Sequence, residues 1–137
     1  MIKNSLLFMA AIVAFPTLAA APASITGRWT TGDGKAVVEI TSCGATHCGK
    51  IQRLLVKEPV GGAKDTENPN KALRSRKLIG IPVLWSLKAS DDGWTGKGYA
   101  PEEGRHVTAT ITRAGANLKV KGCIKIFCRT AIWKSAS

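Results

Sequence analysis

The chain has 137 residues, of which 20 are Lys or Arg and nine are Asp or Glu, so its formal charge at pH 7 is +11. This length is enough for one domain with a single modest core, which excludes an arrangement of several domains. A chain this basic is attracted to anionic surfaces such as lipid headgroups, acidic glycans or nucleic acid. The basic residues are scattered from Arg28 to Lys134, which favours a role in solubility over a single binding patch.

The first 23 residues have the layout of a secretory signal peptide. Lys3 precedes an apolar run from Leu6 to Phe15, and small residues follow. The run has about ten residues, well short of the roughly 20 that span a bilayer, so no transmembrane segment is expected. Cleavage is predicted after Ala23, with Ala20 as the alternative. Residues 24–137 would then be a single β-barrel domain, periplasmic or secreted, for which nucleic acid is not an expected partner.

The mature chain has the pattern of short strands separated by tight turns. Gly27-x-Trp29 begins the first strand as in small antiparallel barrels of the calycin type, with Trp29 filling one barrel end. Residues 105–113 show the clearest alternation, in which Val107, Ala109 and Ile111 face inward and the intervening threonines outward. Further strands are predicted at 36–43, 48–56, 78–87, 94–100, 118–123 and 128–134.

Residues 57–70 interrupt this pattern with a long polar loop. Asn68 and Pro69 predict a helix start within it, with Asn68 as N-cap and the helix ending near Ser75. Farther along, Gly96 and Gly98 indicate sharp strand curvature or a close backbone neighbour. About eight strands joined by sequential hairpins predict an all-β fold. The expected architecture is a small antiparallel up-and-down barrel with one short helix in a long loop.

Four cysteines occur as two pairs of identical spacing, Cys43-x4-Cys48 and Cys123-x4-Cys128. In an exported protein an even number of cysteines predicts disulfides, and three pairings are possible. The two local bonds are favoured, because residues that face each other across a tight hairpin lie within disulfide reach. The alternative is a zinc site with four thiolate ligands, which an oxidising compartment argues against. Neither a metal nor a cofactor is therefore expected.

Residues suited to catalysis are few. His47 lies inside the first cysteine pair and His106 begins an alternating strand, and both are interpreted as surface histidines. The motifs of serine hydrolases and phosphate-binding loops do not occur in the sequence. Residues 65–68 are rich in oxygen ligands, but they lack the length, the glycine and the closing glutamate of an EF-hand. An enzyme is not expected.

The loop and predicted helix from Asp65 to Gly80 are the sharpest candidate for a site. Asp65, Asn68, Arg74 and Arg76 concentrate charged and hydrogen-bonding groups there. The two arginines could clamp a carboxylate or a phosphate through paired hydrogen bonds. In the alternative interpretation, Asp65 pairs with one of these arginines and fastens the loop over a barrel end.

A set of motifs spread over the mature chain resembles a known bacterial family, domain of unknown function 2147. The motifs are Gly27-x-Trp29, Asp33-Gly34, Cys43-Gly44 with Cys48-Gly49-Lys50-Ile51, Asp65-x-x-Asn68-Pro69, Leu73-Arg74-x-Arg76-x-Leu78-Ile79-Gly80, Gly93-Trp94-x-Gly96, Pro101-Glu102-x-Gly104, and Gly122-Cys123 to Cys128-Arg129-Thr130 through Trp133. The resemblance implies an exported, lipocalin-like barrel and no particular activity. His106-Val107 departs from the family, which usually has Tyr or Phe soon after the Pro-Glu-x-Gly turn.

The same resemblance suggests a contact at the barrel end. In lipocalins a basic residue from a late strand packs over the opening tryptophan. This predicts a cation–π contact between Arg129 and Trp29.

Two functions remain open at this point. The first is a binding protein for a small apolar or amphipathic molecule, including an anionic one, gripped at the barrel mouth by Arg74 and Arg76. The second is an envelope interaction module with a solid core, whose basic surface meets anionic protein, glycan or lipid. A lined cavity of ~300 Å³ or more favours the first function and a packed interior favours the second. The tryptophans either line such a cavity or, as favoured here, mostly fill the core: Trp29, Trp85, Trp94 and Trp133.

Overall fold

The computed structural model describes residues 8–16, 21–91 and 93–136. Eight strands and one short 3-10 helix occur in this part of the chain, which confirms the all-β prediction. In chain order they are β1 (Gly27–Thr30), β2 (Ala36–Cys43), β3 (Thr46–Leu54), η1 (Lys71–Leu73), β4 (Pro82–Ser90), β5 (Gly93–Ala100), β6 (Arg105–Ala114), β7 (Asn117–Ile124) and β8 (Phe127–Ser135).

The predicted signal segment is only partly described. Residues 8–16 and 21–23 contain no helix or strand, while Lys3 and the alternative cleavage point after Ala20 lie outside the described residues. Among the helices of the described ranges, none has the length and apolar character needed to span a membrane.

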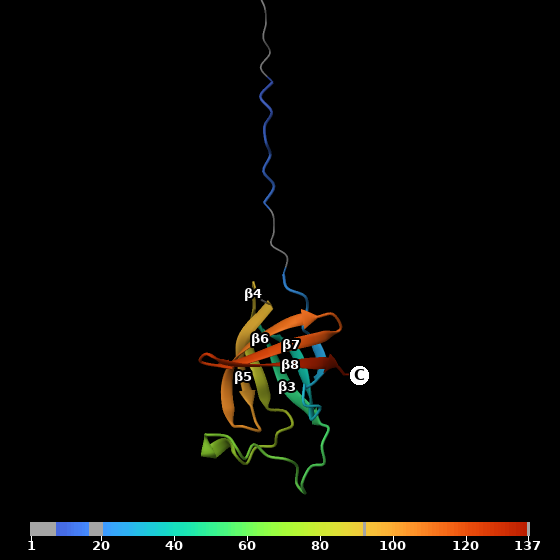
Figure 1. The fold of residues 1–137 in the computed structure, drawn as a ribbon, viewed down its shortest axis with the longest axis vertical. Coiled ribbons are helices and arrows are strands. Elements are labelled where there is room, and N and C mark those ends of the chain that lie inside the picture. Colours follow the sequence, from blue (N-terminus) through green and yellow to red (C-terminus); the bar gives the residue numbers. More distant parts are fainter. Residues whose placement is uncertain (1–7, 17–20, 92, 137) are drawn as a thin grey trace, which may run out of the picture.

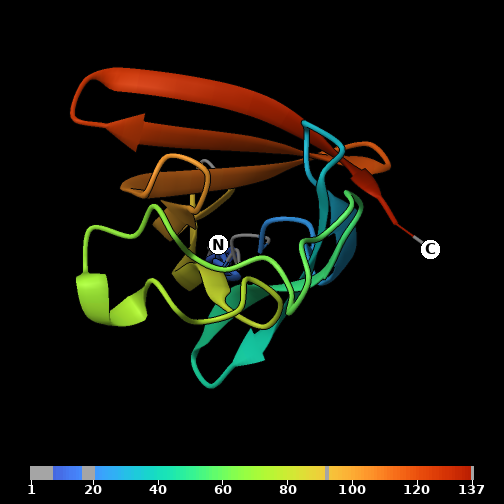
Figure 2. The same cartoon turned by 90° about the horizontal axis from the view of Figure 1, so that it is seen from below.

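Each strand pairs with the next in antiparallel fashion, and β8 returns to β1, so the sheet closes into the predicted up-and-down barrel (Figure 1). The alternating direction of the strands places the β1–β2, β3–β4, β5–β6 and β7–β8 connections at one end, called here the open end. Figure 2 views the molecule from this side, with the long β3–β4 loop in front. The opposite, closed end carries the other turns and the chain entry into β1.

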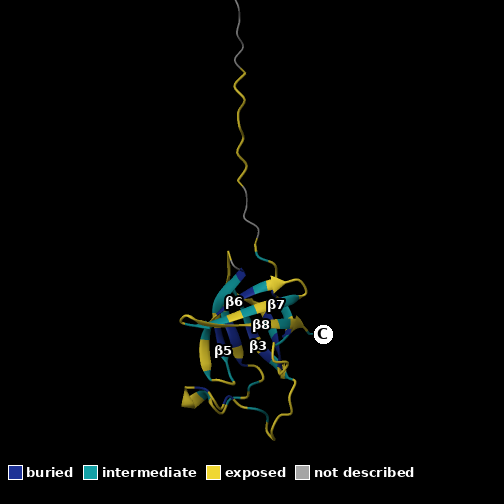
Figure 3. Cartoon of the chain, viewed as in Figure 1, coloured by how far each residue is buried: buried dark blue, intermediate teal, exposed yellow. Residues whose placement is uncertain are grey.

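Inward-facing apolar side chains fill the closed half of the barrel, and Figure 3 shows burial concentrated on the strands. Ile40, Ile111 and Leu118 are completely buried. Trp29 closes this end as predicted, and its Nε1 donates a hydrogen bond of 2.9 Å to the carbonyl oxygen of Ile25.

The basic residue over Trp29 is Arg113, not Arg129, so that prediction is wrong. The guanidinium carbon of Arg113, at the closed end of β6, lies 5.1 Å from the centre of the Trp29 ring. On β8 the residue paired with Trp29 is Ser135. Arg129 lies six residues earlier on the same strand, which is about 20 Å away along its axis. It is therefore at the open end, where it contacts Glu103.

Local predictions were partly confirmed. In β6, Ala109 and Ile111 are buried and the threonines are more exposed, as the alternation indicated. A Cβ atom at Gly96 would lie 2.6 Å from the carbonyl oxygen of Trp85, which confirms the close backbone neighbour. The predicted start of β4 at residue 78 is wrong, because the strand begins at Pro82.

The predicted helix from Asn68 to Ser75 reduces to the single turn Lys71–Leu73. Its N-cap is Asn70, whose side chain accepts from the amide of Ala72. Asn68 uses its own side chain to accept from the amide of Asn70 and to donate to Asp65. These local bonds compete with a longer helix.

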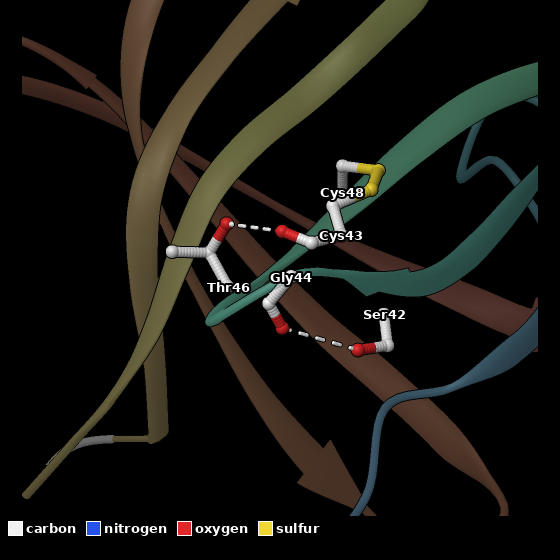
Figure 4. Close-up of a disulfide and its surroundings, with 5 residues drawn as sticks. All are labelled: Ser42, Cys43, Gly44, Thr46 and Cys48. Carbon is white, nitrogen blue, oxygen red and sulfur yellow. Dashed lines mark hydrogen bonds between the residues drawn. A yellow bond between two sulfur atoms is a disulfide. The ribbon is translucent and has the colours of Figure 1, made fainter.

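Both local disulfides form as predicted, with Cα–Cα distances of 5.8 Å for Cys43–Cys48 and 4.1 Å for Cys123–Cys128. Cys123 and Cys128 face each other directly across the β7–β8 hairpin. The other bond is diagonal, because Cys43 pairs with Thr46 in the β2–β3 ladder. Figure 4 shows this turn, where the Thr46 hydroxyl donates to the carbonyl oxygen of Cys43.

Candidate functional site

The open half of the barrel contains a cavity of about 530 Å³. The cavity exists because small residues occupy inward-facing positions on four neighbouring strands: Gly98, Ala109, Gly122 and Ala131. Larger apolar side chains complete the wall, among them Val38, Ile51, Leu84, Val107 and Trp133. The interior is therefore an apolar chamber above a packed closed end, within the size range of small-molecule sites.

The tryptophans divide between several environments. Trp133 lines the cavity, while Trp29 and Trp94 lie near the closed end, where Trp94 Nε1 donates to the carbonyl oxygen of Ala23 at 3.0 Å. Trp85 pairs with Lys97 and faces the outside of the barrel. One tryptophan in four thus contributes to the cavity. Trp29 is buried in the core, whereas Trp85, Trp94 and Trp133 are only partly buried against it, so the expectation that most tryptophans fill the core is confirmed for Trp29 alone.

Charged residues border the cavity mouth. Lys35 Nζ lies 2.9 Å from a carboxylate oxygen of Glu102, and Arg129 Nη1 lies 2.7 Å from a carboxylate oxygen of Glu103. The hydrogen bond and negative charge of Glu102 raise the pKa of Lys35 above its ordinary value. All four side chains are largely exposed, so these ion pairs are screened by salt and can exchange partners. An arriving anionic group can therefore replace a carboxylate at either cation.

A second group of polar residues is centred on Asp65, whose side chain is completely buried. The Tyr99 hydroxyl donates to Asp65 Oδ1 at 2.6 Å. Asn68 Nδ2 donates to Oδ2 at 2.8 Å. Arg76 Nε donates to the same oxygen at 2.9 Å, and Arg76 Nη2 forms an ion pair with it, also at 2.9 Å. These four residues are called the Asp65 cluster below. Three of the four predicted site residues belong to it.

Arg74, the fourth predicted residue, supports the Asp65 cluster from its surface. Its side chain is exposed, and its Nε donates to the carbonyl oxygen of Asn68 at 2.7 Å. The backbone adds further ties, since the amide of Asp65 donates to the carbonyl oxygen of Arg76 at 3.0 Å. These bonds fold the β3–β4 loop back on itself.

The Asp65 cluster lies on the outer wall of the barrel, so its predicted position at the mouth is wrong. Tyr99 pairs with His106, while the adjacent pair, Gly98 and Val107, lines the cavity. Since successive side chains on a strand point to opposite faces, Tyr99 points outward. The β3–β4 loop covers it, which is why Tyr99 is buried despite facing out.

The pairing of Asp65 with Arg76 matches the alternative interpretation, but it fastens the loop against the outer wall and not over a barrel end. A smaller hollow of about 330 Å³ lies beside the cluster, and its lining includes Arg76, Tyr99, Trp85 and His106. Ligand binding by Asp65, Asn68, Arg74 or Arg76 stays a prediction. If it occurs, it takes place on this outer face.

The electrostatics of the Asp65 cluster favour a charged Asp65 and a neutral Tyr99. Burial alone would raise the pKa of the Asp65 carboxyl, but the hydrogen bonds from Tyr99, Asn68 and Arg76 and the positive charge of Arg76 outweigh it, so the pKa lies below its ordinary value. Burial, together with the hydrogen bond to Asp65 and its negative charge, raises the pKa of Tyr99 to about 12. Both oxygens of the buried Asp65 carboxylate accept hydrogen bonds, as a buried charge needs.

Sequence reasoning missed Tyr99 and the residues of the cavity mouth. Tyr99 is the only tyrosine of the chain, and the need of a buried aspartate for donors could have suggested it. The residues of the mouth could have been predicted by counting strands, because the turns that contain Asp33 and Glu102 both follow odd-numbered strands. Their side chains had to lie at one end of an up-and-down barrel.

Neither histidine lies on the cavity lining. The ring of His47 lies 4.6 Å from that of Trp94 near the closed end, and His106 lies on the outer wall, 5.0 Å from the Tyr99 ring. Within the described residues, no three His, Cys, Asp or Glu side chains are arranged to hold a metal ion.

A closed eight-stranded barrel with an apolar cavity at one end defines a lipocalin-like protein. The chain belongs to the family described as "Uncharacterized protein conserved in bacteria (DUF2147)", which it matches over residues 27–135. No curated protein matches its sequence. Among solved structures it is similar to protein HP1028 from the human pathogen Helicobacter pylori, described as belonging to the lipocalin family. The TM-score is 0.71 at 21% identity, over 83% of this chain and 84% of the other.

Proposed function

We propose that this protein binds a small apolar or amphipathic molecule inside its barrel. The observation that carries the proposal is the cavity of about 530 Å³ with its apolar wall. It exceeds the ~300 Å³ above which a small-molecule site is favoured over a solid core. The alternative of an interaction module with a packed interior has correspondingly less support.

The charges at the mouth favour an amphipathic ligand with an anionic head. The apolar body of such a ligand would contact Val107, Leu84 and Trp133 in the cavity. Its carboxylate or phosphate would replace Glu102 at Lys35 or Glu103 at Arg129. Charge-assisted hydrogen bonds to these cations orient the head toward solvent.

We further propose that the protein works outside the cytoplasm and without catalysis. The signal-like first 23 residues and two disulfides support a periplasmic or secreted location, because disulfides persist in oxidising compartments. A binding role is supported by a cavity wall made mainly of apolar groups.

The first test is native mass spectrometry of protein purified from its own exported fraction, compared with its denatured mass. Extra mass that disappears on denaturation identifies a bound ligand, and the denatured mass also reads the cleavage point. A protein that is bare, and stays bare against a panel of fatty acids and lipids, contradicts the proposal.

A matched pair of variants then locates the ligand. Val107 lines the cavity, whereas the next residue of β6, Thr108, is exposed on the outer wall. Val107→Trp fills part of the cavity and is expected to abolish ligand retention. Thr108→Trp adds the same side chain outside and is expected to leave it unchanged. Equal retention by both variants would place the ligand elsewhere, and the hollow beside Arg76 would be the next position to test.

A further inference from the structure

The charges of this chain are strongly segregated once the fold is taken into account. All nine acidic residues lie between Asp33 and Glu103. The segment after Glu103 contains only basic charges: Arg105, Arg113, Lys119, Lys121, Lys125, Arg129 and Lys134. That segment forms β6, β7 and β8, which are neighbours in the barrel. Arg113 lies over Trp29 at the closed end, and Arg129 is paired with Glu103 at the mouth. The cationic character of this side of the barrel therefore comes mainly from exposed lysines of β7, its turn and β8: Lys119, Lys121, Lys125 and Lys134.

The β7–β8 hairpin on this side ends in exposed apolar residues. Ile126 is 86% exposed and Phe127 is 75% exposed, and Lys125 beside them has a φ of 55°, as the tight turn requires. The Cys123–Cys128 disulfide lies directly behind the turn and holds its shape. Covering large apolar side chains that are in contact with water lowers the free energy, so such residues favour docking on another surface.

This hairpin also projects from the barrel. β1 pairs with β8 at two positions, Trp29–Ser135 and Thr30–Lys134, so the earlier part of β8 is paired with β7 alone. Figure 2 shows the hairpin, in orange and red, extending past the rest of the sheet. The tip is thus accessible to a broad, flat surface.

We propose that the tip of the β7–β8 hairpin docks on the surface of an anionic lipid bilayer. Ile126 and Phe127 enter the interfacial region, while Lys121 and Lys125 contact the lipid phosphates. A short apolar tip combined with cations fits this surface, since peripheral binding combines buried apolar area with attraction to anionic headgroups.

The docking tip belongs to the same hairpin as part of the cavity wall. Gly122, Arg129 and Ala131 of the same hairpin line the cavity, so its walls and the docking tip form one unit. The proposal stands on the hairpin and its charges and does not require that the cavity holds a ligand.

Vesicle flotation tests the proposal on the mature, disulfide-bonded protein. Vesicles of phosphatidylcholine containing phosphatidylglycerol are expected to bind it, and vesicles of phosphatidylcholine alone are not. The Ile126→Ser, Phe127→Ser double variant is expected to lower the partition coefficient by about ten-fold or more. Lys121→Gln and Lys125→Gln are each expected to lower it about five-fold. These side chains are exposed, so melting temperatures should be unchanged.

Controls come from the side of the molecule that carries the acids. Val60→Ser changes a fully exposed apolar residue of the β3–β4 loop, and Lys64→Gln removes an exposed charge there. Both are expected to bind vesicles like the parent protein. Losses equal to those of the hairpin variants would overturn the assignment to this hairpin. Undiminished binding of the Ile126→Ser, Phe127→Ser variant would overturn insertion of the tip.

A second measurement separates lipid from other anionic partners. Phe127→Trp places a reporter at the tip, whose fluorescence brominated lipids in anionic vesicles are expected to quench beyond the quenching of the parent protein. Binding to soluble heparin without binding to anionic vesicles would overturn the proposal in favour of an acidic glycan. Val107→Trp is expected to bind vesicles normally, so a failure of ligand binding and a failure of docking are read out separately.

Discussion

Replacing Asp65 with asparagine tests whether the Asp65 cluster holds the β3–β4 loop on the barrel. The Asp65 carboxylate is completely buried and accepts from Tyr99, Asn68 and Arg76. Asp65→Asn preserves the shape of the side chain, but it replaces one accepting carboxylate oxygen with an amide group that donates. It also leaves the Arg76 charge without its partner. Removing one partner of a buried ion pair costs about 3–5 kcal/mol.

The structure places the expected loss at the lower end of that range. The Arg76 side chain is 31% exposed, so water recovers part of its hydration once Asp65 is neutral. We therefore expect Asp65→Asn to lower the free energy of unfolding by about 3 kcal/mol, a large fraction of the 5–15 kcal/mol typical of a domain. Urea unfolding at neutral pH, followed by circular dichroism with both disulfides intact, measures this loss.

Two comparison variants make the result specific. Arg74→Gln removes an exposed side chain that donates to one carbonyl oxygen and is expected to cost less than about 1 kcal/mol. Tyr99→Phe removes a hydrogen bond to a charged acceptor and is expected to cost about 1.5–3 kcal/mol. Combined with Asp65→Asn, it should cost less than the sum of the single changes, because the two residues share one bond. A loss from Asp65→Asn no larger than that from Arg74→Gln would refute the reasoning.

Three further outcomes follow from the same structure. Tyr99 is the only tyrosine, so tyrosinate absorbance should titrate near pH 12 in the native protein and near 10.0 in urea. Because the pKa of Tyr99 is higher in the folded protein, its protonated hydroxyl contributes fully to stability below pH 10, and this contribution is lost as the pH rises from there toward 12. The folded pKa of Asp65 is lowered from 3.8, so its contribution is complete above that pH and is lost as the pH falls below it, and acid unfolding of Asp65→Asn should lack this component. Gly96→Ala would place a Cβ atom 2.6 Å from the Trp85 carbonyl oxygen and is expected to cost roughly 1–3 kcal/mol in urea unfolding. At Gly98 the nearest atoms would be a Val107 methyl at 3.0 Å and the Val83 carbonyl oxygen at 3.3 Å, so Gly98→Ala should cost less.

Much of the fold was predictable because its signals are local. Alternation in β6 depends on the two-residue period of a strand, and the disulfide between Cys123 and Cys128 depends on a hairpin of few residues. The position of Trp29 at a barrel end was predicted from the Gly27-x-Trp29 motif of the first strand. The helix begins later than predicted, because the Asn68 side chain accepts from the amide of Asn70 and Asn70, not Asn68, caps η1. The position of Asn68 depends in turn on its bond to Asp65.

The candidate site was only half predictable for the same reason. Asp65, Asn68 and Arg76 lie within 12 residues of each other, so their chemistry could be recognised from the sequence. Their partner Tyr99 is 34 residues from Asp65, and strand alternation alone did not show that the loop would cross the outer wall to reach it.

The amino-acid sequence by itself determined the strands, their turns, the inward and outward faces and the two local disulfides, since each depends on neighbours in the chain. The tertiary structure decided everything that depends on barrel closure. Closure placed Arg113 rather than Arg129 over Trp29, because the short strand β1 pairs only with the last residues of β8, beyond Arg129. It also brought Gly98, Ala109, Gly122 and Ala131 together from four strands. Each of these small residues is unremarkable alone, and only their convergence on one interior leaves a volume that no side chain fills.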